Sequence, residues 1–322
     1  METRAKKKID LSNMSSLIVL VVLCVALSIA EPAFHSFNNL INILQQVTTI
    51  AVLALGVNVV IFTGGIDISV GSVVAFTGIV MGKIIVEGGM PTIVGIAAAL
   101  IIGALCGTFN GIMISKFKLQ PMIATLAMMS MARGAAYTIA DGNTITGYSA
   151  GFRWIGTGTI PGTQIPVQII FMIALYIVFY YVMKYRKFGR YIYSIGGNEE
   201  ATRLSGINVD KYKTLAYTLS GLCAGISSVI LTAKLNSAQS TAGLDYEMDA
   251  IASCVIGGTS LLGGSGSVWG TFVGAIIMIV IRNGLNLLNV SSNLQKLVIG
   301  VVILLAVLAD AFRNGAVSRK KK

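Results

Sequence analysis

Long apolar runs, separated by short polar segments, fill almost the whole chain. A helix that crosses a membrane needs about 20 mostly apolar residues. We count ten candidate runs, at 14–34, 43–62, 68–86, 92–114, 121–140, 166–184, 213–234, 249–265, 267–288 and 295–312. The third and the eighth are weak, being short, glycine-rich or polar at one end, so each could be a broken helix or a re-entrant segment. The pattern predicts an all-α transmembrane bundle of about ten spans, or of eight spans with two re-entrant segments.

The composition agrees with a chain whose solvent is lipid. Of its 322 residues, 55% are hydrophobic and 11% are charged, whereas a soluble domain carries about 25% charged residues. A soluble fold with this balance would expose too much apolar surface, which lipid tails can cover. The first run follows a basic N-terminus, as in a signal peptide. No convincing cleavage site follows it, so we expect an uncleaved first span.

The basic residues predict the orientation. If both termini are cytoplasmic, 18 of the 24 Lys and Arg residues lie in or beside the inner segments, which are the two tails, 115–120 and 185–212. The longest outer loop, 141–165, holds Arg153 as its one basic residue. Cytoplasmic segments carry an excess of Lys and Arg, so this asymmetry favours two cytoplasmic ends. The net charge of +11 then suits anionic lipid head groups rather than nucleic acid.

The expected organisation follows from these boundaries. We expect a basic cytoplasmic N-tail at 1–13, one membrane domain at 14–312 and a basic cytoplasmic C-tail at 313–322. A cytoplasmic loop at about 185–212 interrupts the membrane domain. The outer segment 141–165 is rich in Gly, Thr and Ser, and we expect a surface loop that a partner could touch.

Few residues offer chemistry of their own. The four cysteines each lie in an apolar run and His35 stands alone, so we expect neither a disulfide framework nor a metal site. Gly82-Lys83 is followed by Ile84, which breaks the nucleotide-binding loop pattern. We therefore expect no catalytic residue and no cofactor. If ATP powers this protein, another polypeptide must bind the nucleotide.

Small residues recur at the spacing that lets two helices pack closely in lipid. The rows are Gly103, Gly107 and Gly111; Gly266, Gly270 and Gly274; and Gly221 with Gly225. We expect packing faces there, either within the bundle or between two copies of the chain.

The segment 63–72 (TGGIDISVGS) places a carboxylate, Asp67, between two apolar runs. Gly64 and Gly65 allow turns or close backbone approach. An acidic residue near membrane depth is costly, so it usually has a partner or a role. Asp67 either caps or pairs with its surroundings, which we favour, or contacts a substrate. A similar glycine-interrupted stretch occurs at 257–268, by duplication or by chance.

A short helix is predicted in the inner loop. Good helix formers run from Glu199 to Leu204, and Gly206 supplies a stop. Such a helix could dock into a groove of a soluble partner, or it could simply be solvated. The residues concerned are Asn198, Glu199, Glu200, Ala201, Arg203, Leu204 and Gly206.

Three of these stretches, 63–72, 196–207 (GGNEEATRLSGI) and 249–264 (DAIASCVIGGTSLLGG), together resemble the ribose-type permeases of bacterial ATP-binding cassette sugar importers. The resemblance runs from about residue 37 to residue 310. It includes 39–46 (NLINILQQ), 239–248 (QSTAGLDYEM) and 283–292 (NGLNLLNVSS). Several long motifs in the same order make it specific.

The resemblance implies a multi-pass subunit of the bacterial inner membrane that translocates a monosaccharide, with ribose expected first. It also implies cytoplasmic ATPase subunits on the inner loops, an extracellular sugar-binding protein and a second permease copy. The loop 199–206 is similar to the coupling loop of importer permeases, with Glu200-Ala201 as its core. The proline that usually follows the glycine at position 206 is missing, as in the ribose-type branch.

Polar residues within or between spans are candidates for a sugar pathway or gate, although the same residue types also hold helices together. The candidates are Asn58, Gly64, Gly65, Asp67, Asn110 and Asn283. Arg133 and Arg282 could be interior, or could reach the interface. The alternative function is an ion-coupled secondary sugar transporter or channel. That class normally needs buried carboxylates, for which Asp67 and Asp249 are the chief candidates.

Overall fold

The computed structural model describes residues 11–319, and side chains from 16 to 312. That part of the chain is almost wholly helical. Its α-helices are α1 (Leu11–Ala30), α2 (Phe37–Phe62), α3 (Val70–Gly82), α4 (Thr92–Ser115), α5 (Pro121–Ala140), α6 (Ala150–Thr157), α7 (Val167–Tyr185), α8 (Lys187–Gly197), α9 (Glu199–Leu204), α10 (Val209–Leu235), α11 (Tyr246–Ile256), α12 (Val268–Leu287) and α13 (Ser292–Arg319). A 3₁₀-helix η1 (Pro32–His35), a π-helical turn η2 (Lys83–Glu87) and the strands β1 (Ile145–Thr146) and β2 (Ser237–Ala238) complete it.

Within residues 11–319, seven helices are long and apolar enough to cross a membrane: α2, α3 continued by η2, α4, α7, α10, α12 and α13. The expected spans at 14–34 and 121–140 correspond to α1 and α5. The weak third span is one continuous helix that widens into the π-helical turn η2 without a break. The fold is all-α, as predicted.

The expected span at 249–265 is wrong as a continuous helix. There α11 has 11 residues, and an irregular segment, 257–267, follows it. Gly258, Gly263 and Gly264 in this segment have φ of 87°, 86° and 68°, which a right-handed helix cannot contain. This agrees with the alternative that the eighth apolar run is broken.

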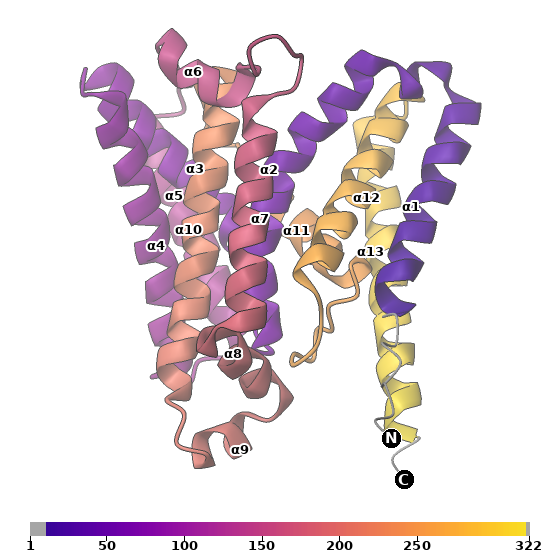
Figure 1. Cartoon of the computed structure of the whole chain (residues 1–322). Coiled ribbons are helices and arrows are strands. Elements are labelled where there is room, and N and C mark those ends of the chain that lie inside the picture. Colours follow the sequence, from indigo (N-terminus) through magenta and orange to yellow (C-terminus); the bar gives the residue numbers. More distant parts are fainter. Residues whose placement is uncertain (1–10, 320–322) are drawn as a thin grey trace.

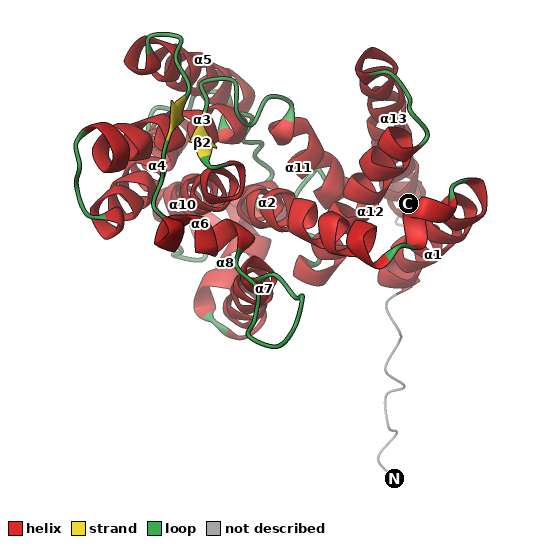
Figure 2. Ribbon diagram, turned by 90° about the horizontal axis from the view of Figure 1, so that it is seen from above, coloured by secondary structure: helices red, strands yellow, loops and turns green. Residues whose placement is uncertain are grey.

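Two groups of helices lie on either side of α2 (Figures 1 and 2). One group contains α3, α4, α5, α7 and α10, and the other contains α1, α12 and α13. Helix α2 packs against α10 on one side and against α12 and α11 on the other. In its most apolar stretch 83% of α2 is buried, against 6% for α13, so α2 is the core helix and α13 faces the surroundings.

The glycine rows are packing faces within the chain, as one of the two expectations had it. Between α4 and α10, a Cβ added at Gly107 would overlap the carbonyl oxygen of Tyr217, and one at Gly221 would overlap that of Gly103. Between α12 and α11, a Cβ at Gly274 would overlap the carbonyl oxygen of Ser253. These helices therefore touch backbone to backbone, which small residues alone permit.

Helices α8 and α9 lie at one end of the bundle, and α6 lies at the other (Figure 1). We call these the α8–α9 end and the α6 end. The segment 141–165 is more ordered than the surface loop we expected, because it contains β1 and α6. Ile145 pairs with Ala238 of β2, and Gly156 of α6 lies against the backbone of α10 at Lys234.

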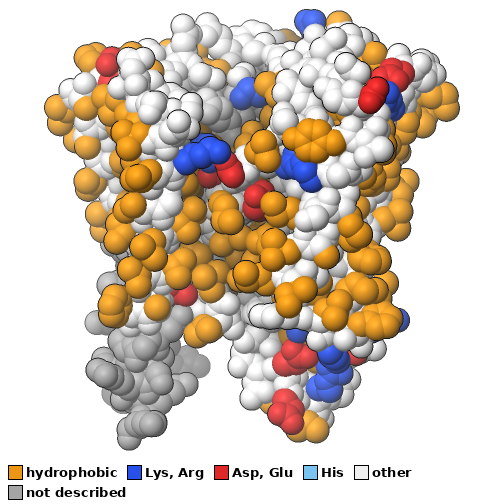
Figure 3. Space-filling model, turned by 180° about the vertical axis from the view of Figure 1, so that it is seen from behind, with side chains coloured by type: hydrophobic (Ala, Val, Ile, Leu, Met, Phe, Trp, Pro, Cys, Tyr) orange, Lys and Arg blue, Asp and Glu red, His pale blue; other side chains and the backbone are white. Residues whose placement is uncertain are grey.

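Hydrophobic side chains cover much of the face seen in Figure 3, while charged side chains gather near its ends and around a hollow in its upper half. Large apolar side chains such as Ile18, Leu105 and Leu304 are about 60% exposed. In water that surface would be unfavourable, so lipid is its natural surrounding.

Candidate functional site

The short helix α9 has the bounds that the sequence predicts, Glu199–Leu204. Asn198 precedes it in an extended conformation, and its side-chain Oδ1 accepts a hydrogen bond from the Ala201 N–H at 2.9 Å. Gly206 follows with φ of 80°, the left-handed conformation that ends helices. Local capping alone therefore explains where this helix begins and ends.

A network of ion pairs holds α9 against the start of α10. Glu199 pairs with Lys213 at 2.8 Å and with Arg203 at 3.3 Å, and Arg203 pairs with Asp210 at 2.9 Å. Lys118 joins Asp210 at 2.9 Å. Partial burial raises the pKa of the Glu199 carboxyl, but the hydrogen bonds and charges of its basic partners outweigh this, so its pKa lies below the ordinary value.

The opposite face of α9 is unpartnered within the described residues. Leu204 is 84% exposed, and Glu200 and Ala201 are exposed as well. The inward residue is Thr202, whose hydroxyl lies 2.8 Å from that of Ser194 on α8. The exposed face of α9 thus presents one apolar side chain, Leu204, among charged groups. The inward face of α9 is fixed to α8.

Three glycine-containing segments meet beneath α8, at a place that we call the glycine junction. It consists of Gly196 and Gly197, the end of α2 with Gly64, and Gly263 with Gly264. The Gly264 N–H donates to the Phe62 carbonyl at 3.0 Å. A Cβ at Gly196 would overlap that same carbonyl oxygen and approach the Gly264 nitrogen. At this junction α8 contacts the loops after α2 and α11 directly, through backbone atoms.

Asp67 lies in the loop between α2 and α3 and is 1% exposed. Its Oδ1 accepts from the Ser69 N–H at 3.0 Å and from the Ser69 hydroxyl at 2.6 Å, and its Oδ2 accepts from the Ser220 hydroxyl at 2.8 Å. Asn110 donates to the Ser69 hydroxyl at 3.0 Å. The carboxylate therefore ties the start of α3 to α10 and, through Ser69, to α4. This agrees with the capping or pairing role that we favoured.

The other amide candidates also join helices. Asn58 accepts from the Thr259 hydroxyl at 2.9 Å, which attaches α2 to the segment 257–267. Asn283 and Asn39 exchange two hydrogen bonds, of 3.0 and 2.8 Å, between α12 and α2. The partners are about 200 and 244 residues apart in the sequence, so no local sequence pattern predicts either pairing.

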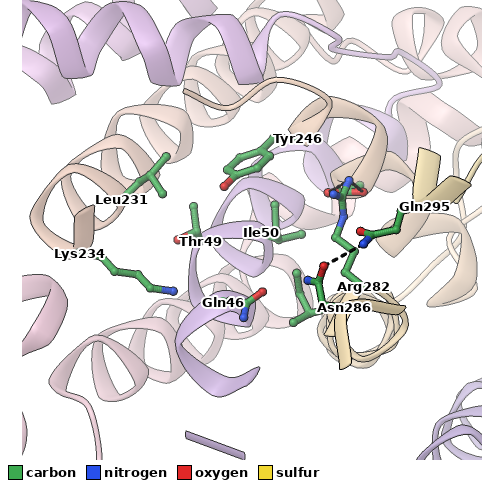
Figure 4. Close-up of a pocket in the computed structure, with 11 residues that line it drawn as sticks. Gln46, Thr49, Ile50, Leu231, Lys234, Tyr246, Arg282, Asn286 and Gln295 are labelled. Atoms are coloured by element: carbon green, nitrogen blue, oxygen red, sulfur yellow. Dashed lines mark hydrogen bonds and ion pairs between the residues drawn. The ribbon is translucent and has the colours of Figure 1, made fainter. Parts of the chain in front are cut away.

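A polar cavity of about 180 Å³ lies near the α6 end, where α2, α10, α11, α12 and α13 meet (Figure 4). Asp249 and Arg282 form an ion pair of 2.8 Å in its wall. Gln46, Lys234 and Asn286 also line it. Sequence analysis named Asp249 and Arg282 without pairing them. It missed Gln46 and Lys234, for which the available signal was a polar side chain at the edge of an apolar run.

Comparison with known proteins gives consistent results. The family model described as "Branched-chain amino acid transport system / permease component" matches residues 39–307. The "Ribose import permease protein RbsC" of Escherichia coli (strain K12) is 47% identical over 305 residues, which are 93% of this chain and 94% of that protein. The protein of the same name from Bacillus subtilis (strain 168) is 43% identical over 297 residues, 90% of each chain. The "D-allose transport system permease protein AlsC" of Escherichia coli (strain K12) is 33% identical over 293 residues, 91% of this chain and 89% of that protein. No solved structure matches the chain.

Proposed function

Since the chain belongs to the permease-component family of branched-chain amino acid transport systems, we propose that it is the membrane-spanning permease subunit of an ATP-binding cassette importer for ribose. It is a multi-pass protein of the bacterial inner membrane. The assignment of ribose as the substrate rests on sequence identity. The chain is 47% and 43% identical to two ribose import permeases over nine-tenths of each chain, against 33% to a D-allose permease. Hydrolysis of ATP belongs to a separate subunit.

The proposed topology has ten membrane-crossing segments with both termini cytoplasmic. The eighth segment is α11 together with the irregular 257–267. Support comes from α1 and α13, which begin and end toward the α8–α9 end (Figure 1), and from the basic residues. The membrane domain spans 14–312, between tails at 1–13 and 313–322. Residues 1–10 and 320–322 of these tails lie outside the described part of the chain.

Helix α9 is the proposed docking element for a cytoplasmic ATPase subunit. Its exposed face supports this role, because an apolar side chain ringed by charged groups suits a groove in a soluble partner. Asn198 and Gly206 fix its ends, and Glu199 and Arg203 fix its base. Since α8 connects α9 directly to the glycine junction, a displacement of α9 would reach the ends of α2 and α11.

On the basis of that junction we propose different roles for the pathway candidates. Gly64, Gly65 and Asp67 lie in the loop after α2, and Asn58 ties α2 to the segment 257–267, so these four are proposed inner-gate residues. Asn110 supports the gate through Ser69. Asn283 is proposed to hold α12 against α2 through its hydrogen bonds with Asn39.

An extracellular sugar-binding protein and a second copy of the chain complete the proposed complex. The binding protein would dock at the α6 end, where Trp154 is 52% exposed. An exposed aromatic side chain is typical of interface anchors. The second copy would complete the translocation pathway.

Reconstitution in liposomes tests the proposal. The chain would be combined with its ATPase and a ribose-loaded binding protein, and ribose uptake and ATP hydrolysis would be measured with Glu200→Lys as the test variant. Glu87→Lys is the matched control, because it makes the same charge reversal at the α6 end, which an ATPase on the cytoplasmic side cannot reach. We expect Glu200→Lys to lose ATPase binding and uptake, and Glu87→Lys to retain ATPase binding.

Two results would contradict the proposal. If ribose crosses with the chain alone and without ATP, the protein is an ion-coupled carrier or a channel. If both variants bind the ATPase as the unaltered chain does, α9 is not the docking element.

A further inference from the structure

We infer that the polar cavity between α2, α10, α11 and α12 binds the transported monosaccharide, as a neutral polyol, within a single chain. The inference rests on the proposed function and deepens it by naming a substrate site. Of the amides first considered, Asn58 and Asn283 already bond to other parts of the chain. The cavity brings together several polar side chains that have no bonding partner among the described residues.

Several side chains of the cavity are free to bind. Within residues 16–312, no hydrogen bond or ion pair involves the side chains of Gln46 or Lys234 or the hydroxyl of Tyr246. Figure 4 shows the Lys234 ammonium and the Gln46 amide turned toward each other, with the Tyr246 hydroxyl facing the same space. Each of these side chains is partly exposed, so a ligand that displaces water from the cavity can take up its hydrogen bonds.

The chemistry of the wall suits a sugar. A monosaccharide presents hydroxyls, which both donate and accept, and the amides of Gln46 and Asn286 do the same. Ile50, Leu231 and the Tyr246 ring supply apolar surface for the C–H groups. In small-molecule sites, convergent polar groups of this kind fix the orientation of the ligand.

The wall of the cavity carries one net positive charge. Asp249 is 1% exposed and pairs with Arg282, so those two charges cancel. Lys234 is then the single unmatched charge of the wall, and it can donate hydrogen bonds to hydroxyls.

The position of the cavity fits transport. Gly156 of α6 lies directly against the backbone of Lys234, so the proposed docking surface for the binding protein adjoins the cavity wall. The walls come from both helix groups and from α2 and α11 between them. A shift of one group against the other would therefore change the cavity and release its ligand.

Ribose binding to the full chain in nanodiscs, titrated by saturation-transfer NMR, tests the inference. Lys234→Met and Gln46→Leu should each weaken binding about tenfold, the effect of one lost hydrogen bond of about 1.4 kcal/mol. Gln45→Leu and Lys296→Met are matched controls, since neither residue lines the cavity, and both should bind within about twofold of the unaltered chain. Lys234→Arg keeps a donor and should retain most of the affinity, which separates lost contact from misfolding.

The outcomes distinguish this site from the proposed function. If the cavity variants bind ribose as their controls do, the inference is overturned even where ATP-driven uptake is intact. If inorganic sulfate binds at Lys234 and ribose does not, the cavity is an anion site and the inference also fails. If ribose binds at the cavity but the assembled importer does not transport it, the site stands and the proposed function falls.

Discussion

Replacing Gly196 with alanine tests the backbone contact between α8 and the end of α2. The added methyl group would overlap the carbonyl oxygen of Phe62 and come close to the nitrogen of Gly264. Both are backbone atoms, so no change of side-chain rotamer can make room. The methyl must either displace α8 or separate the Gly264 N–H from its acceptor, a hydrogen bond of 3.0 Å.

The expected cost follows from these contacts. Overpacking of a close contact costs about 1–3 kcal/mol, and loss of a buried hydrogen bond costs about 1 kcal/mol. The higher helix propensity of alanine stabilises the variant by at most about 1 kcal/mol. We therefore expect Gly196→Ala to lower the free energy of unfolding by about 1–3 kcal/mol. Gly197→Ala is the control, because a Cβ there meets nothing within 4 Å, and it should be neutral or slightly stabilising.

Two measurements on this pair of variants are decisive. The thermal midpoint of the purified chain in detergent should fall for Gly196→Ala alone. In the assembled importer, Gly196→Ala should still bind the ATPase, since α9 is unchanged, yet lose stimulation of ATP hydrolysis by the loaded binding protein. Equal midpoints and equal stimulation for the two variants would refute the close contact and its part in coupling.

Three further predictions concern polar contacts. Arg282→Met should destabilise the chain by about 3–5 kcal/mol, because the Asp249 carboxylate is left buried and unpaired, and adding Asp249→Asn should recover part of the loss in unfolding assays. A double-mutant cycle of Asn39→Leu and Asn283→Leu should give a coupling of about 0.6–1.7 kcal/mol in bilayer-mimetic detergent, as for other interhelical hydrogen bonds in membranes, and a value of zero would disprove the pairing. Since the pKa of Glu199 is depressed in the folded chain, its stabilising contribution is complete above the ordinary value of 4.5 and is lost as the pH falls below it. Amide exchange of α9, corrected for intrinsic rates, should then accelerate at acid pH in the unaltered chain and not in a Glu199→Gln variant.

Features with a local physical cause could be predicted from the sequence. Span length depends on hydrophobic thickness, so nine of the ten expected spans correspond to helices of 18 residues or more. The ends of α9 depend on Asn198 and Gly206, which are signals within a few residues. Helix α8 was missed, because its apolar face is mixed with charged residues inside a loop already assigned as cytoplasmic.

The candidate site was harder to predict because its contacts are distant in sequence. Asp67 meets Ser220 across 153 positions, and Asp249 meets Arg282 across 33. A polar side chain within an apolar run shows that a partner is required, but not which partner. Lys234 gives no local sign that it faces a cavity, since a lysine at the end of a span also reaches the interface readily.

Helix α11 connects the two sites of the molecule. Its first turn carries Asp249 in the cavity wall, and the segment after its last turn forms part of the glycine junction; the 11-residue helix is about 16 Å long at 1.5 Å per residue. Backbone contact at Gly274 makes α11 and α12 one rigid unit, so the Asp249–Arg282 pair moves as a whole. The opposite wall, with Gln46 and Lys234, belongs to α2 and α10, which are themselves in close contact at Gly56. Between the two units α2 and α11 meet through side chains, where sliding costs less than at a backbone contact. A displacement of α9 that reaches α11 through the junction should therefore change the distance between the two cavity walls without distorting either wall. By this motion, docking of the ATPase at the α8–α9 end would release a sugar from the cavity near the α6 end.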